Sequence, residues 1–183
     1  MNGSTADPRL EGRAVRHIAF SAEQIAARVR ELGAAITSSY SDGDLLVLGL
    51  LKGSFIFLSD LVRQINRPLQ VDFLVASSYG NDIVSSGNVR LVYDPETELE
   101  GKHILLVEDI VDSGRTLATV MDLLRARSPR SIEICALLDK RVATHLTYPP
   151  KFTGFEAPNE FLVGYGLDHA ERFRHLPYIA SLQ

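Results

Sequence analysis

Three carboxylates lie close together in the middle of the chain, where a strongly apolar segment ends. Glu108 and Asp109 follow directly after residues 104–107, and Asp112 comes three residues later. The next four residues are Ser113, Gly114, Arg115 and Thr116. Carboxylate oxygens bind Mg²⁺ or hydroxyl groups, whereas hydroxyls and free backbone N–H groups at a helix start bind anions such as phosphate. The segment therefore combines a site for a hydroxylated or metal-bound group with a site for phosphate.

The elements on either side place these groups at the end of a buried strand. Residues 104–107 are continuously apolar, which is typical of a strand covered on both faces in a parallel sheet. A helix ending near Arg127 is predicted by the helical spacing of Leu117, Val120, Met121 and Leu124. Because ligands in open α/β sheets bind at the carboxyl ends of strands, we expect Glu108 and Asp109 to face one crevice. On this segment alone, acidic residues that only cap a helix are an equally good interpretation.

Residues 107–116 closely resemble the phosphoribosyl pyrophosphate (PRPP) signature of the type I phosphoribosyltransferases. Three other segments resemble the purine-salvage branch of that family, the hypoxanthine-guanine phosphoribosyltransferases: residues 51–54, 77–80 and 154–168, with Arg174 following. The four segments have the order and spacing of the family and together span residues 45–178. The resemblance implies a Mg²⁺-dependent enzyme that converts hypoxanthine, guanine or both, with PRPP, to IMP or GMP and pyrophosphate.

The resemblance also implies a role for each residue of the PRPP segment. Glu108 and Asp109 would contact the ribose hydroxyls, directly or through Mg²⁺. Asp112 would be the catalytic base that accepts a proton near purine N7. The 5′-phosphate would be bound by Ser113, Gly114, Arg115 and Thr116, together with the backbone amides of residues 112–116.

Pyrophosphate would be bound by residues outside this segment. Lys52 and Gly53 stand between a predicted strand and a predicted helix, which makes their loop a second anion site. In the family this loop often contains a non-proline cis peptide bond, which would fall at Lys52–Gly53. Asp168 would bind a second Mg²⁺ together with pyrophosphate, and Arg174 would supply a further cation.

The purine would lie in a pocket made by Lys140, Phe161, Leu162 and Asp168. By resemblance, Lys140 donates to the 6-oxo group, Phe161 stacks on the ring and the Leu162 carbonyl accepts from the base. Leu162 replaces a frequent valine, which leaves the preference between guanine and hypoxanthine open. Ser78 and Tyr79 would begin a loop that closes over the site and excludes water.

Composition describes an ordinary globular protein with no bulk attraction for polyanions. The 183 residues, 45% hydrophobic and 23% charged, fit a single domain over residues 17–183 behind a flexible polar tail at 1–16. The net charge of −4 argues against a nucleic-acid or membrane partner, so PRPP must be held by local groups. With no signal peptide or apolar span, and one cysteine (Cys135) in a buried strand, we expect a cytoplasmic enzyme. The family leads us to expect a homodimer or homotetramer.

Alternating strand and helix patterns predict an α/β fold with a mainly parallel twisted sheet and helices on both faces. A small hood around the base pocket is implied by the resemblance. Predicted helices cover residues 21–38, which begin with a capping box at Ser21, and 55–65. Predicted strands cover residues 45–50, 71–76, 89–93, 132–138 and 161–163, whereas 147–158 is interrupted by proline and glycine.

Two other functions fit the same motifs. A PRPP- or nucleotide-sensing regulator could use the same fold, although such regulators lose catalytic groups or add a DNA-binding segment. A phosphoribosyltransferase for xanthine would need the same chemistry with another base. A lysine that donates to a 6-oxo group argues against adenine but leaves xanthine open.

Overall fold

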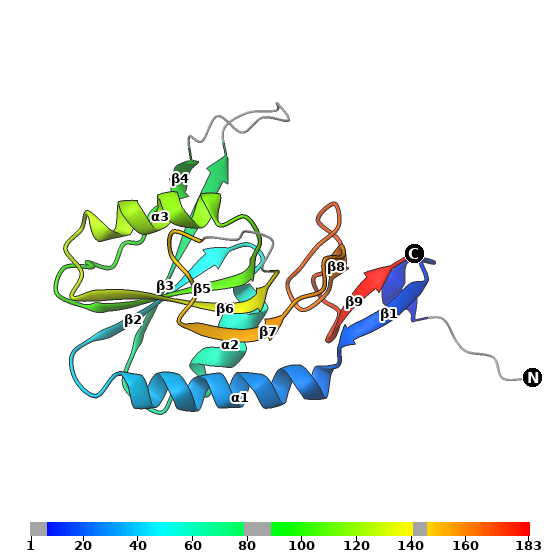
Figure 1. Ribbon diagram of the computed structural model, residues 1–183, viewed down its shortest axis with the longest axis horizontal. Helices are drawn as coiled ribbons and strands as arrows, with labels where there is room; N and C mark the ends of the chain where they lie inside the picture. Colours follow the sequence, from blue (N-terminus) through cyan, green and yellow to red (C-terminus); the bar gives the residue numbers. More distant parts are fainter. Residues whose placement is uncertain (1–6, 79–88, 141–145) are drawn as a thin grey trace, which may run out of the picture.

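A twisted sheet of six strands forms the centre of the part of the chain that the structure describes, residues 7–78, 89–140 and 146–183 (Figure 1). In this computed structural model the strands are β2 (Leu45–Leu51), β3 (Gln70–Ser78), β4 (Val89–Tyr93), β5 (His103–Val111), β6 (Ser131–Asp139) and β7 (Phe152–Glu156). Their order is β4-β3-β2-β5-β6-β7. Neighbouring strands are parallel except for the antiparallel β3–β4 pair. The predicted mainly parallel sheet is confirmed.

Helices cover both faces of this sheet, also as predicted. Helices α1 (Ala22–Ser39) and α2 (Phe55–Val62) lie on one face, and α3 (Arg115–Arg125) lies on the other (Figure 1). Alternate residues of β2 enter different apolar clusters: Val47 joins the cluster of α1 and α2, whereas Leu46 joins that of α3. This two-sided burial explains why β2 and β5 have continuous apolar runs instead of alternating patterns.

A local sequence signal sets the start of α1. The Ser21 hydroxyl accepts from the Gln24 backbone N–H, and the Gln24 side chain accepts from the Ser21 N–H, so the predicted capping box is confirmed. Helix α2 ends at Val62, three residues earlier than predicted.

Among the described residues, none of the helices has the length and hydropathy that a bilayer crossing requires.

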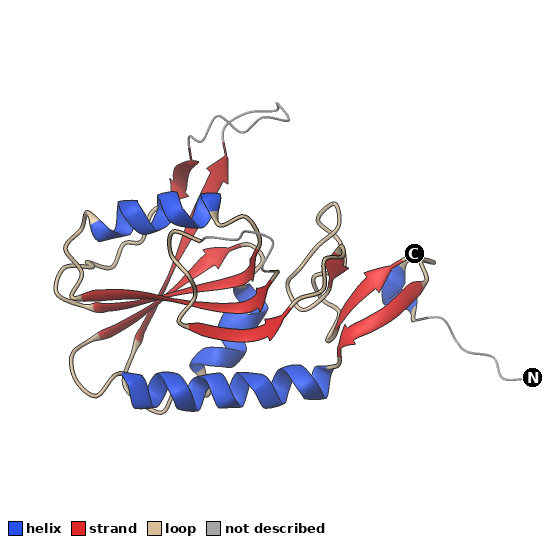
Figure 2. Cartoon of the chain, in the orientation of Figure 1, coloured by secondary structure: helices blue, strands red, loops and turns tan. Residues whose placement is uncertain are grey.

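A second, antiparallel sheet lies beside the carboxyl ends of the central strands. Its described strands, in the order β1-β9-β8, are β1 (Val15–Phe20), β9 (Ile179–Leu182) and β8 (Leu162–Val163), at the right of Figure 2. We call this sheet, together with the loop 164–178, the hood. Strand β8 matches the strand expected at 161–163, and the separate small sheet agrees with the hood that the resemblance implied.

The N-terminal boundary differs from the expectation. A 3₁₀ helix covers Pro8–Leu10, and β1 begins at Val15, so the predicted tail at 1–16 is wrong from Pro8 onward. The physical reason is burial: Leu10 is 6% exposed and packs in a cluster with Val163, Phe173 and other hood residues. One apolar side chain in a polar segment was too weak a signal to reveal this contact.

Strand β7 was not predicted, because proline and glycine interrupt its surroundings. It pairs with the edge of β6, and a Cβ atom on Gly154 would lie 2.4 Å from the Leu137 carbonyl oxygen. The glycine that suggested irregular structure is therefore required for close approach of two strands.

Replacing Ser21 with alanine should lower the free energy of unfolding by about 1 kcal/mol, because the first turn of α1 loses its side-chain cap. Urea denaturation measures the change. The control is Ser38→Ala, since Ser38 lies on the same helix and its hydroxyl only bonds back to the Ala34 carbonyl. If both variants change stability equally, the cap is not what stabilises this end of α1.

Candidate functional site

The carboxyl ends of three adjacent parallel strands meet at one edge of the sheet, next to the hood. Lys52 and Gly53 follow β2, Glu108 and Asp109 belong to the last part of β5, and Lys140 follows β6. Because β5 is paired with β2 on one side and β6 on the other, all five residues lie at the same edge. The predicted site residues from distant parts of the sequence are brought together here.

The acidic pair lies within β5 and not after it, because the strand continues to Val111. Glu108 lines a cleft on the side of α3, and Asp109 lines an adjoining cleft beneath the hood, with Ile110 in the lining of both. The two carboxylates therefore point to opposite sides of the strand, whereas a single crevice for both was expected. The reason is strand geometry, since successive side chains of an extended chain point to opposite sides.

The cleft that contains Glu108 is formed by the loop between β5 and α3. Its volume is about 140 Å³ and its remaining lining is residues 110–117. Gly114 has φ +70°, a left-handed conformation that glycine adopts without strain, and Arg115 is the first residue of α3. None of the described side chains caps this helix, so its first backbone N–H groups are available to an anion. Ser113 and Thr116 line the same cleft.

The cleft beneath the hood is a pocket with apolar walls and charged edges. It has a volume of about 210 Å³ and is lined by Asp109, Ile110, Lys140, Phe161, Leu162, Leu167 and Asp168. All of the predicted purine-pocket residues are therefore present in it. The Phe161 side chain is 59% exposed and meets the His169 ring edge-on, with centroids 5.3 Å apart and an 86° interplanar angle. The two rings therefore have the edge-to-face arrangement that aromatic pairs prefer.

Asp112, which lines the cleft beside α3, and Lys140, which lines the pocket beneath the hood, come from different loops and approach each other between the two clefts. The distance from Lys140 Nζ to Asp112 Oδ2 is 3.6 Å, and the side chains are 17% and 56% exposed. The backbone N–H of Lys140 also donates to the Val111 carbonyl at 3.0 Å, which ties the end of β6 to the end of β5. A cation and a carboxylate are therefore held side by side.

A second charged group lies where the hood meets the loop after β2. Arg174 Nη2 lies 2.8 Å from Asp168 Oδ1, and Arg174 Nη1 donates to the Gly166 carbonyl at 2.8 Å. Lys52 reaches the same group through Glu171, whose Oε2 accepts from Lys52 Nζ at 3.1 Å and from Arg174 Nη2 at 3.3 Å. Sequence reasoning missed Glu171. Its position, three residues from both Asp168 and Arg174, was the available signal.

Two glycines allow the hood to touch the loop after β2. A Cβ atom on Gly166 would lie 2.0 Å from the Gly53 carbonyl oxygen, and one on Gly53 would lie 1.8 Å from Asp109 Oδ2. The non-proline cis peptide bond of this loop is Leu51–Lys52, so its expected place at Lys52–Gly53 is wrong. Gly53 is required because its backbone packs closely against Asp109 and Gly166. This close packing, and not a cis peptide bond, explains why the residue is glycine.

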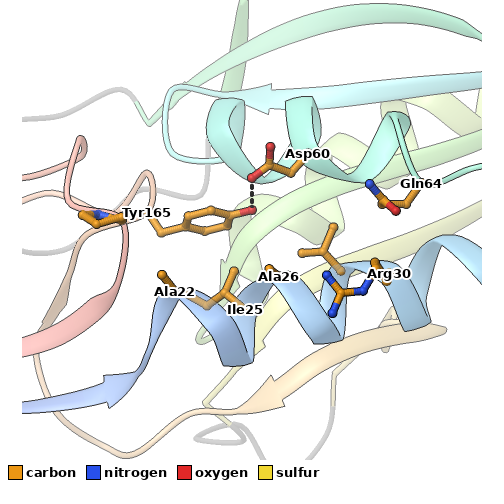
Figure 3. A pocket seen from close by; sticks show the side chains of 9 residues that line it. Ala22, Ile25, Ala26, Arg30, Asp60, Gln64 and Tyr165 are labelled. Atoms are coloured by element: carbon orange, nitrogen blue, oxygen red, sulfur yellow. Dashed lines mark hydrogen bonds between the residues drawn. The ribbon is translucent and has the colours of Figure 1, made fainter.

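Tyr165 anchors the hood to α2. Its hydroxyl donates to Asp60 Oδ2 at 2.7 Å across a cleft of about 330 Å³ between α1, α2 and the hood (Figure 3). The side chain is buried, and this burial, with the Asp60 hydrogen bond, raises the pKa of Tyr165. The hydroxyl therefore stays protonated and the anchor persists throughout the neutral pH range. The anchor holds the hood loop, which continues from Tyr165 to Asp168, against α2. Helix α2 in turn follows the loop that contains Lys52.

The carboxylates at the end of β5 are costly to ionise. Burial, and then the neighbouring Asp109 charge, raise the pKa of Glu108 well above its ordinary value. Burial raises the pKa of Asp109 to about 6, although the Ile110 N–H and the more distant Arg174 act in the opposite direction. Such poorly compensated carboxylates, with Asp168 nearby, are suited to a cation that arrives with a ligand.

The predicted closing loop begins at Ser78 and Tyr79, where the described part of β3 ends. Ser78 is the last residue of β3, so the predicted loop begins where that strand ends. Tyr79 lies outside the described residues, and its role stays a prediction.

The described residues include no convergent group of three His, Cys, Asp or Glu side chains.

Comparison with known proteins gives a consistent result. Residues 20–170 match the family model described as the phosphoribosyl transferase domain. A hypoxanthine-guanine phosphoribosyltransferase of Bacillus subtilis is 47% identical over 169 residues, which cover 92% of this chain and 94% of the relative. A hypoxanthine phosphoribosyltransferase of Escherichia coli K12 is 46% identical, with 87% and 90% covered. The crystal structure of a hypoxanthine phosphoribosyltransferase from Staphylococcus aureus superposes with a TM-score of 0.88 at 39% identity, covering 92% of both chains.

The variant Asp109→Asn should stabilise the metal-free protein in a pH-dependent manner. The folded-state pKa of about 6 exceeds the ordinary value of 3.8, so the wild type loses stability as the pH rises through this window. Asparagine cannot ionise and avoids that loss. We expect a gain of about 1–3 kcal/mol at pH 7.5 and roughly half of that at pH 5.

Urea denaturation in EDTA at the two pH values measures this difference. Asp44→Asn is the matched control, because Asp44 is an exposed aspartate at the opposite edge of the sheet. It should change stability by less than about 0.5 kcal/mol. Equal stability of Asp109→Asn and wild type at both pH values would show that the buried charge is not costly.

Proposed function

The chain belongs to the phosphoribosyltransferase family, and we propose that it is a purine salvage enzyme that transfers ribose 5-phosphate from PRPP to hypoxanthine and guanine. The products are IMP or GMP and pyrophosphate. The relatives reported above are named as enzymes, which favours catalysis over the regulator alternative. The observation that carries the assignment of the base is the Asp112–Lys140 pair.

This pair matches one edge of a 6-oxopurine. The N7 and O6 atoms lie next to each other on that edge, and Lys140 Nζ and Asp112 Oδ2 are 3.6 Å apart. Lys140 can only donate, so it suits the 6-oxo acceptor and disfavours the 6-amino group of adenine. Asp112 accepts the proton that leaves N7 as N9 forms its bond to C1′. Phe161 offers an exposed aromatic ring to the base.

PRPP spans the two clefts at the end of β5. Its 5′-phosphate binds the N-terminus of α3 through the backbone N–H groups and the side chains of Ser113 and Thr116. Because Glu108 and Asp109 lie on opposite sides of β5, they approach the ribose hydroxyls from different directions. The leaving pyrophosphate lies toward Lys52 and Arg174. In this arrangement C1′ is held between the base and its leaving group.

The same carboxylates fit Mg²⁺. Glu108 and Asp109 would hold one ion with the ribose oxygens, and Asp168 would hold a second with pyrophosphate. This fits the absence of a three-residue metal cluster among the described residues, because Mg²⁺ keeps several waters and substrate oxygens. When bound, Mg²⁺ neutralises charge on the pyrophosphate and so makes it a better leaving group.

Assembly and location complete the proposal. A homodimer or homotetramer stays our prediction from the family. The single cysteine, Cys135, is buried and free, as is common in proteins of reducing compartments, and we keep the cytoplasm as the proposed location.

The direct test is incubation with PRPP, Mg²⁺ and each of hypoxanthine, guanine, xanthine and adenine, with nucleotide formation followed by chromatography. We expect turnover with hypoxanthine and guanine, none with adenine, and loss of activity in EDTA. Turnover with xanthine alone would reassign the substrate. Absence of turnover with any base, together with normal PRPP binding, would favour the sensing regulator.

The variant Asp112→Asn keeps the shape of the side chain and removes its basicity. We expect kcat with hypoxanthine to fall by about 10²–10⁴-fold, because proton removal from N7 loses its acceptor. The Kd for PRPP, measured by calorimetry, should stay within about threefold, and Asp44→Asn should have wild-type kinetics. Near-normal turnover in Asp112→Asn would remove Asp112 from the role of base.

A further inference from the structure

We infer that Glu171 is an internal counter-ion for the two pyrophosphate-binding cations, Lys52 and Arg174. It occupies both cations while the site is empty, and it lowers the affinity of the enzyme for pyrophosphate. The inference rests on the proposed function, because that function assigns Lys52 and Arg174 to the leaving group.

A single oxygen atom makes both contacts. Glu171 Oε2 accepts from Lys52 Nζ at 3.1 Å and from Arg174 Nη2 at 3.3 Å. Lys52 belongs to the loop after β2, whereas Glu171 and Arg174 belong to the hood, so the carboxylate bridges two parts of the fold. It stands where an anion bound by both cations would stand.

A backbone turn places Glu171 next to both cations. Ala170 and Glu171 have φ values of +51° and +65°, which form a tight turn in the left-handed region. The Glu171 N–H donates to Asp168 Oδ2 at 2.9 Å, and His169 and Arg172 exchange two backbone hydrogen bonds of 3.1 Å. Asp168, Glu171 and Arg174 therefore lie on one side of a short, closed turn.

The charges of this group balance without a ligand. Lys52 and Arg174 carry two positive charges, and Asp168 and Glu171 carry two negative charges. Both cations lie within ion-pair distance of the Glu171 carboxylate, at 3.1 Å for Lys52 and 3.3 Å for Arg174. A pyrophosphate that binds the same cations meets an adjacent negative charge and must displace it.

The exposure of Lys52 and Glu171 indicates that a bound anion can displace the Glu171 carboxylate from the two cations. The side chains of Lys52 and Glu171 are 67% and 65% exposed, and ion pairs at such positions contribute little to folding. The hood has a separate, buried anchor in the Tyr165–Asp60 hydrogen bond. Glu171 can therefore leave the cations without loosening the hood, which distinguishes a counter-ion from a structural strut.

The sign of an affinity change tests the inference. Calorimetric titration of pyrophosphate in excess Mg²⁺ gives Kd for the wild type and for Glu171→Gln, and product inhibition gives Ki for pyrophosphate. We expect both constants to fall by about tenfold in Glu171→Gln, because a competing charge is removed. Glu171→Asp, with a shorter reach to the two cations, should give an intermediate Kd. The control is Glu11→Gln, since Glu11 forms an exposed ion pair with Arg172 of the hood and touches neither cation.

Each result has a separate meaning. If the wild type does not bind pyrophosphate, the proposed function fails at this site whatever Glu171 does. If the wild type binds and Glu171→Gln binds equally or more weakly, the counter-ion is rejected while the proposed function stands. If Glu171→Gln does not fold, the carboxylate is structural and the inference is also rejected. Tighter binding in Glu171→Gln, with Glu11→Gln unchanged, supports it.

Discussion

The loop after β2 and the hood touch through Gly53 and Gly166, with no room for a side chain on either residue. A Cβ atom would lie 2.0 Å from the Gly53 carbonyl in one case and 1.8 Å from the Asp109 carboxylate in the other. This contact joins the central sheet to a separate sheet that shares none of its strand pairing. Asp168, Glu171 and Arg174 meet Lys52 and Asp109 only because the two parts approach so closely. The Tyr165–Asp60 hydrogen bond stabilises the same arrangement from the other side of the hood loop.

The electrostatics of the site follow from this packing. A chain with a net charge of −4 has no general attraction for a polyanion, so it relies on local cations, three of which are paired with carboxylates. Lys140 is paired with Asp112, and Lys52 and Arg174 are paired with Glu171. Glu108 and Asp109, in contrast, are half-buried and have no ion-pair partner among the described residues, and desolvation raises the pKa of both. In the free protein, the three cations are thus already paired with carboxylates, whereas Glu108 and Asp109 can still bind a cation. This arrangement suits substrates that bind as magnesium complexes.

Much of the fold could be predicted because its signals are local. Apolar runs predicted β2, β5 and β6, the capping box at Ser21 predicted the start of α1, and helical spacing predicted α3. Strands β1, β7 and β9 escaped prediction because they are short or lie at edges, and the pairing of β1 with β9 joins segments distant in sequence. The buried Leu10 belongs to the same class, since its burial depends on hood residues more than 150 positions away.

By itself the sequence determined which residues can do chemistry, because residue type and spacing suffice for that. The carboxylates at 108, 109 and 112, the hydroxyls and glycine that follow, and the family resemblance need no coordinates. Only the tertiary structure decided how these groups are distributed. The continuation of β5 to Val111 sends Glu108 and Asp109 to different clefts, since strand side chains alternate in direction. The contact of the hood with the β2 loop places Glu171 between two cations, one of them 119 positions away, and no local pattern encodes that approach.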